Sequence, residues 1–193
     1  MAASPLKLIV GLGNPGARYA RTRHNAGWWF IDALSRQHHG VWHMERAQQA
    51  ALARVRVDEA DVWLAKPQSF MNHSGTAVAA VAGFYRIEPA EILIVHDEID
   101  LPPGAVRFKL GGGHGGHNGL RDVIAHIGSD FWRLRLGVGH PGARELVLDA
   151  VLDRPQAQEQ QLIEQAMQRA LQCLPDLLRG EGQKAMHRLH TEV

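Results

Sequence analysis

The chain has 193 residues, of which 45% are hydrophobic and 21% charged, and its formal net charge is +1. This length suits one domain with a sizeable core, and the small net charge argues against a protein that binds nucleic acid without specificity. The start of the chain lacks a basic region followed by a long apolar one, so no secretory signal is expected. The apolar stretch at 77–85 is about half as long as a membrane span. The single cysteine, Cys173, excludes an internal disulfide and fits a reducing cytoplasm, where we expect the protein to act.

Strands and helices alternate along the predicted chain. The hydrophobic pattern predicts strands at 6–10, 51–57, 61–65, 92–96, 106–110 and 131–138, and helices at 27–38, 74–85, 120–127 and from after Pro155 to 178. In the last helix, Cys173 is expected to be buried, and Leu162, Ala166, Ala170 and Leu174 lie in register. A break at 180–182 precedes a short basic tail. With no repeat or linker, the pattern predicts one α/β domain over 1–193, built around a largely buried sheet.

Charge is distributed unevenly. Residues 1–27 hold four cations and no acid, and residues 101–144 hold six cations against two acids. Residues 87–100, between them, hold five acids and no base. Two basic, glycine-rich segments around an acidic strand end indicate a polarised surface with a face for phosphate groups. Chance clustering on solvated loops is the alternative.

Segment 13–25 is the most informative part of the chain. It follows the first strand directly and combines a tight Gly-Pro turn, three arginines and His24. A histidine titrates near neutrality and can take a proton from water beside a polyanionic substrate. The alternative is that His24 and Asn25 only cap the following helix, since asparagine is a preferred N-cap.

Two other kinds of site compete for the same residues. Segment 11–16 matches the dinucleotide-binding fingerprint, but that site needs a helix to open immediately, and here the helix is expected only near Gly27. A metal site is the second competitor. Its candidate ligands are His96, Asp97, Glu98, His114 and His117. The last two lie among flexible glycines that cannot fix a helical pair of ligands, and no His-Glu-x-x-His motif is present.

A hydrolase without a metal is the third possibility. Asp97 follows the strand 92–96, and ligands bind at the carboxyl ends of strands in open α/β sheets. A carboxylate there could orient His24 and stabilise its protonated form. Asn14, Asn72 and Asn118 lie in loops beside glycine or serine, and neutral amides can position water or stabilise an oxyanion. Each asparagine taken alone reads more simply as a turn or cap residue.

Five motifs in order resemble bacterial peptidyl-tRNA hydrolases. They are Gly13-Asn14-Pro15-Gly16 through Thr22-Arg23-His24-Asn25, then 70–75, 96–104, 109–120 and 133–142. The resemblance covers nearly the whole chain. It implies a three-layer α/β/α domain with a twisted mixed β-sheet, and hydrolysis of the ester between a peptide and the tRNA 3′ ribose. It implies no metal and no cofactor, no membrane, and a monomer without an obligate protein partner.

The resemblance also implies roles for single residues. His24 matches the catalytic base, Asp97 the carboxylate that keeps it basic, and Asn14 the amide that distinguishes N-blocked from free aminoacyl substrates. The positions that match the channel for the peptide and the tRNA 3′ CCA end are Tyr19, Phe70, Met71, Asn72, His117 and Asn118. Lys109 and Arg135 match cations that contact tRNA phosphates of the acceptor end.

Some questions stay open at this point. A tRNA-binding module without catalysis and a metal-dependent hydrolase are the alternatives to the esterase. The pattern does not decide how Asn14, Asn72 and Asn118 divide their work. Nor does it decide whether segment 141–151 or the helix after Pro155 covers the substrate.

Overall fold

A computed structural model describes residues 4–191. The first three residues of the segment in which no secretory signal is expected lie outside this range, as do the last two of the predicted domain. The strands are β1 (Leu8–Gly11), β2 (His43–Glu45), β3 (Ala50–Val57), β4 (Ala60–Pro67), β5 (Ile92–Glu98), β6 (Val106–Leu110) and β7 (Trp132–Gly137). The helices are α1 (Ala26–Gln37), α2 (Ser74–Tyr85), α3 (Asn118–Ile127), α4 (Val147–Val151), α5 (Ala157–Leu178) and α6 (Gly182–Thr191). In the part of the chain that is described, no helix has the length and apolar character to cross a membrane.

One mixed, seven-stranded sheet forms the centre of the described structure, in the order β2-β3-β4-β1-β5-β7-β6. β1, β4, β5 and β7 run parallel, whereas β2, β3 and β6 are joined by antiparallel pairing. Because helices cover both faces of the parallel strands, β1 and most of β5 are buried on both sides. The predicted α/β/α fold with a mixed sheet is confirmed.

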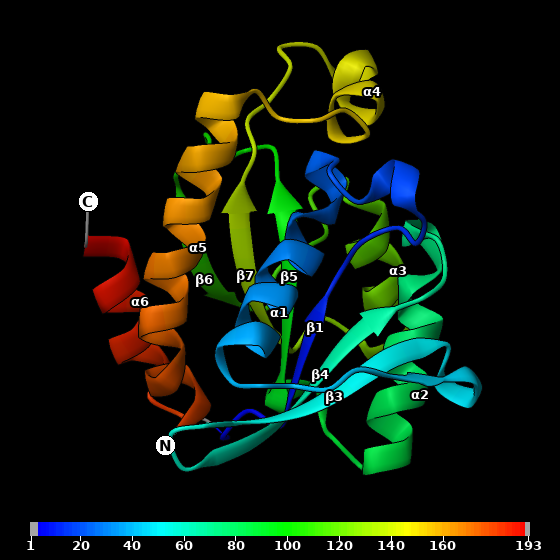
Figure 1. Ribbon diagram of the computed structural model, residues 1–193, viewed down its shortest axis with the longest axis vertical. Helices are drawn as coiled ribbons and strands as arrows, with labels where there is room; N and C mark the ends of the chain where they lie inside the picture. Colours follow the sequence, from blue (N-terminus) through cyan, green and yellow to red (C-terminus); the bar gives the residue numbers. More distant parts are fainter. Residues whose placement is uncertain (1–3, 192–193) are drawn as a thin grey trace.

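Two hydrophobic cores lie on opposite faces of this sheet. α1, α5 and α6 cover one face, and α2 and α3 cover the other (Figure 1). Successive side chains of a strand point to opposite faces, so Leu93 and Val95 of β5 join the first core and Ile92 and Ile94 join the second. The same alternation places Asp97 and His96 on different faces near the end of β5.

Glycine allows α1 to pack directly against β1. A Cβ atom on Gly11 would lie 2.4 Å from the backbone oxygen of Gly27, and one on Gly27 would lie 2.4 Å from that of Val95. The glycines of segment 11–16 therefore serve close packing and turns here, and α1 begins only at Ala26, ten residues after Gly16. This late helix start removes the geometry that a dinucleotide fingerprint requires.

The predicted elements differ from the observed ones in three places. The basic tail after Gly180 forms α6, which packs on α5 and β6, and the short β2 and α4 have no counterpart in the prediction. Leu162, placed on the buried face of the last helix, is 38% exposed, whereas Ile163 is buried. The cause is that the buried stripe near the start of α5 runs through Ile163, Ala166 and Met167. Cys173 is buried, as predicted.

Candidate active site

His24 lies in the 3₁₀ turn η2 (Arg23–Asn25), which leads into α1. Arg23 anchors this turn: its Nη1 donates to the backbone oxygen of Ala150 at 3.0 Å, and its Nη2 pairs with Glu159 at 3.0 Å. Asn25 occupies the N-cap position of α1 but makes no capping hydrogen bond with its side chain. The interpretation of His24 and Asn25 as mere caps is therefore wrong.

Asn25 instead holds the loop that carries Asn14. Its Oδ1 accepts from the backbone nitrogen of Asn14 at 2.9 Å, and its Nδ2 donates to the backbone oxygen of the same residue at 3.0 Å. These two bonds lie in the interior, where an unpaired backbone group would be costly. The turn that carries His24 and the loop that carries Asn14 thus form one rigid unit.

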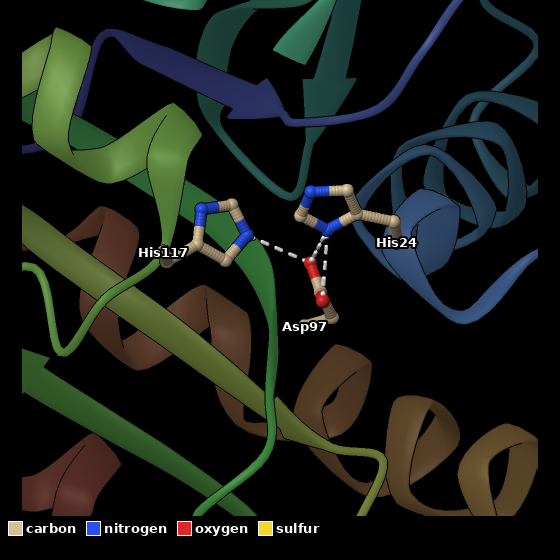
Figure 2. A group of neighbouring side chains, drawn as sticks. All are labelled: His24, Asp97 and His117. Carbon is tan, nitrogen blue, oxygen red and sulfur yellow. Dashed lines mark hydrogen bonds and ion pairs between the residues drawn. The ribbon is translucent and has the colours of Figure 1, made fainter. Parts of the chain in front are cut away.

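Asp97, near the end of β5, lies between two imidazole rings (Figure 2). His24 Nδ1 is 3.0 Å from both carboxylate oxygens, and His117 Nε2 is 2.7 Å from Oδ1. His24 is 7% exposed and Asp97 is 3% exposed. Asp97 therefore orients His24 through Nδ1 and leaves the Nε2 of that ring pointing away from the carboxylate.

Burial and charge act in opposite directions on this pair. Burial lowers the pKa of His24, but the Asp97 charge and hydrogen bond outweigh it, so the pKa is raised above its ordinary value. Burial also favours a neutral Asp97, yet the attraction of His24 and His117 and their hydrogen bonds hold its pKa well below the usual range. The site thus contains an ionised carboxylate that stabilises the protonated form of His24.

His96, the neighbour of Asp97 on β5, faces the opposite side of the sheet. Its Nδ1 donates to the backbone oxygen of Asp97 at 2.8 Å, and its Nε2 has no hydrogen-bond partner in the described structure. Burial first, and then the proximity of His117, lower the pKa of His96 to about 3. His96 is therefore neutral at physiological pH. Because it faces the other side of the sheet, it does not form a pair of metal ligands with Asp97.

The cluster of His24, Asp97 and His117 has the residue types of a metal site, with donor atoms within 4.8 Å of one another. The hydrogen bonds of His117 do not suit a metal. Its Nδ1 accepts from the backbone nitrogens of Gly119 and Leu120, so a neutral ring carries its proton on Nε2, the atom that would face the ion. A metal-bound histidine ordinarily donates from its other nitrogen, and His117 has no proton there.

A cavity of about 610 Å³ opens beside His24 and Asp97. Its lining comes from the end of β5 and from α4, which lies beyond the carboxyl ends of β5 and β7 (Figure 1). The predicted residues His24, Asp97, His117 and Asn118 line it, together with Arg121, His140, Arg144, Val147, Leu148 and Val151. Segment 140–151 thus covers this cavity, whereas the residues of α5 do not line it.

The other residues predicted to line the substrate channel lie in two neighbouring segments, 14–19 and 70–72. Asn14 Oδ1 accepts from the backbone nitrogen of Met71 at 2.7 Å, which joins segment 13–25 to the turn η4 (Met71–His73). Tyr19 contacts Phe70 edge-on, with ring centroids 6.2 Å apart, and Phe70 is 56% exposed. Asn72 is exposed in η4. None of these five residues lines the 610 Å³ cavity.

The predicted phosphate-binding cations lie on the α3 face of the sheet. Lys109 of β6 and Arg135 of β7 line a smaller cavity of about 310 Å³, together with His96, Glu98 and Arg133. Lys109 is exposed, while Arg135 Nε pairs with Glu98 at 2.9 Å. The buried Arg133 donates to the backbone oxygens of Gly112 and Gly113 and so holds the glycine loop.

Several residues of the site were missed from the sequence. Arg133 reads as one more cation of a basic strand, and only its contacts identify it as the anchor of the glycine loop. In the sequence, only a weak apolar spacing distinguishes three further cavity residues, Val147, Leu148 and Val151. The bond from His117 to Asp97 joins positions 20 residues apart, and no local pattern predicts it.

Comparisons with known proteins agree with this arrangement. The family model described as peptidyl-tRNA hydrolase matches residues 8–193. The peptidyl-tRNA hydrolase of Neisseria gonorrhoeae is 49% identical over 191 residues, covering 98% of this chain and 100% of that protein. The one of Aeromonas hydrophila is 52% identical over 190 residues, covering 97% and 96%. The crystal structure of peptidyl-tRNA hydrolase from Acinetobacter baumannii has a TM-score of 0.95 at 44% identity, covering 99% of this chain and 96% of that one. A match over almost the whole length, in sequence and in fold, means that this chain belongs to the peptidyl-tRNA hydrolase family.

Proposed function

We propose that this protein hydrolyses the ester bond between a peptide, or an N-blocked aminoacyl group, and the 3′ ribose of tRNA. The observation that carries the proposal is the contact of His24 Nδ1 with both oxygens of Asp97, 3.0 Å away, at the wall of a large cavity. Family membership supports the substrate, because the relatives are named for it. We further propose that the protein acts in the cytoplasm as a monomer, without cofactor, membrane or obligate protein partner.

In this mechanism His24 activates a water molecule. Asp97 accepts a hydrogen bond from the Nδ1–H group of His24, so the lone pair lies on Nε2 and can take a proton from water. The oxygen of that water attacks the ester carbonyl carbon, and the tetrahedral intermediate collapses with loss of the ribose oxygen. The protonated His24 returns its proton to this oxygen, which releases a peptide carboxylic acid and a free tRNA hydroxyl. An ester has a better leaving group than an amide, so no serine or cysteine nucleophile is needed.

Asn14 is suited to select N-blocked substrates. Its Oδ1 is occupied by the Met71 backbone nitrogen, which fixes the amide so that Nδ2 is the group left to donate. No hydrogen-bond partner of this Nδ2 lies within residues 4–191. A peptide carbonyl can accept from it, whereas the ammonium of a free aminoacyl group offers only donors.

The acceptor end of the tRNA would lie over the cationic face. Lys109 and Arg135 supply charges for phosphates, a contact that positions any tRNA without reading its bases. Tyr19 and Phe70 present aromatic surface for the 3′ CCA end or the first peptide residue. Asn72 in η4 and Asn118 at the start of α3 would supply further amide groups to the substrate.

The test is hydrolysis of N-acetyl-aminoacyl-tRNA beside unblocked aminoacyl-tRNA, with and without exhaustive chelation. We expect release of free tRNA from the blocked substrate in both conditions and little from the unblocked one. Binding without release would identify a tRNA-binding module instead. Loss of release on chelation, restored by zinc or manganese, would identify a metal-dependent hydrolase.

Asn14→Asp tests whether Asn14 selects N-blocked substrates. Aspartate keeps the oxygen that accepts from Met71 but replaces the donor with a second acceptor. We expect kcat/KM for the blocked substrate to fall roughly tenfold, the value of one hydrogen bond, and the preference over unblocked substrate to shrink. An unchanged preference would remove Asn14 from this role.

A further inference from the structure

Both ring nitrogens of His117 are hydrogen bonded, and their partners define which one carries the proton. Nδ1 lies 3.1 Å from the backbone nitrogen of Gly119 and 3.2 Å from that of Leu120. Backbone N–H groups can only donate, so Nδ1 must accept. The neutral ring therefore carries its proton on Nε2, which donates to Asp97 Oδ1 at 2.7 Å.

His117 also occupies the N-cap position of α3, and its Nδ1 replaces the oxygen that usually caps a helix. One imidazole thus joins the beginning of α3 to the catalytic carboxylate. The helix starts at Asn118, which lines the same cavity as His24. Any rotation of the His117 ring would break the cap and the contact with Asp97 together.

The two imidazole rings contact the Asp97 carboxylate in different ways. His24 Nδ1 is 3.0 Å from Oδ1 and 3.0 Å from Oδ2, so that contact does not distinguish the two oxygens. The 2.7 Å bond from His117 goes to Oδ1 alone. The ring itself is confined, with its centroid 4.8 Å from that of His24 and 5.2 Å from that of His96.

We propose that His117 is a positioning residue whose single tautomer, with the proton on Nε2, fixes the orientation of Asp97 and through it that of His24. The sequence resemblance placed His117 among the residues that line the substrate channel. His117 does line the cavity, and its hydrogen bonds give it a second task at the Asp97 carboxylate. The effect on turnover rests on the proposed function, whereas the tautomer is a property of the folded protein alone.

Two substitutions separate the two bonds of His117. In His117→Gln the side-chain nitrogen can reach the position of Nε2 and donate to Asp97, but the acceptor at Nδ1 is lost. In His117→Asn the oxygen can replace Nδ1 as the helix cap, but the side chain is too short for Asp97. His187→Asn is the control, since His187 is an exposed histidine of α6 that lines neither cavity of the site.

We expect His117→Asn to lower kcat about tenfold or more with little change in KM or melting temperature, since it loses a hydrogen bond to a charged group. We expect His117→Gln to keep most of kcat while its melting temperature falls, and His187→Asn to keep both. The reverse pattern, with full turnover in His117→Asn and loss in His117→Gln, would show that His117 is only a helix cap. Equal losses in the two variants, or none in either, would also overturn the proposal.

A spectroscopic measurement tests the tautomer without relying on turnover. The ¹⁵N chemical shifts of the wild-type His117 ring distinguish a protonated from an unprotonated nitrogen, and we expect Nε2 to be the protonated one at pH 8. A proton on Nδ1 would contradict the assignment. If the wild-type protein fails to hydrolyse peptidyl-tRNA, the proposed function fails, and this NMR result still decides the tautomer.

Discussion

The catalytic cavity and the cationic cavity beside it are built in opposite ways. His24 and Asp97 are almost fully buried and bonded to each other, whereas Lys109 is exposed and Arg135 keeps a quarter of its side chain accessible. Proton transfer requires fixed distances between a few atoms, while attraction to phosphate requires charge within reach. Substitutions in the first region should therefore change kcat, and those in the second should change KM and its salt dependence.

His24→Asn is expected to have the largest effect, because it removes the base. General base catalysis contributes about 10²- to 10⁴-fold, so kcat for N-acetyl-aminoacyl-tRNA should fall by that amount. Binding of deacylated tRNA, measured on the same preparation, should stay near the wild-type value. Turnover close to wild type would show that another group activates the water.

Asp97→Asn should have the next largest effect, about 10²-fold in kcat, because the tautomer of His24 is no longer fixed. Its pH dependence gives a second readout. Asp97 raises the pKa of His24, so removing its charge should move the half-point of the acid limb of kcat/KM to lower pH. A half-point that stays in place, or rises, would show that Asp97 does not act on the titrating group.

Lys109→Ala and Arg135→Ala should have smaller effects, confined to binding. Each should raise KM several-fold with little change in kcat, and lower the slope of log KM against log salt by about 1. Arg36→Ala is the matched control, since Arg36 is an exposed cation in the last turn of α1. If the control changes KM equally, the effect comes from net charge and the cationic cavity has no special role.

How much of the fold and the site could be predicted from the sequence depends on whether a residue's contacts are local in the chain. The strands and long helices follow from hydrophobic periodicity, and Asp97 follows from its place at the end of a continuous apolar strand. The segment that carries His24 follows in the same way, because it comes after β1, which is also a continuous apolar strand. Local pattern was enough wherever a residue's neighbours in sequence are also its neighbours in space.

Apart from the pairing of His24 with Asp97, contacts between distant segments could not be predicted in this way. Asn25 looked like a helix cap because its type and position fit one, yet its amide is used by Asn14, eleven residues away. Leu162 fitted the buried stripe of α5 by spacing, but the sheet and its neighbours set which turn of that helix is covered. The short α4, which covers the cavity, depends on Arg23 and its bond to Ala150, 127 residues away.

The most direct test of the account compares two pKa values in the wild-type protein: that of His24 by NMR titration and that of the acid limb of kcat/KM. We expect the two to coincide and to lie above the ordinary histidine value of about 6.5, because Asp97 stabilises the protonated ring. Activity should then be lost as the pH falls through this value. A kinetic half-point clearly separated from the titration of His24 would contradict its role as the base.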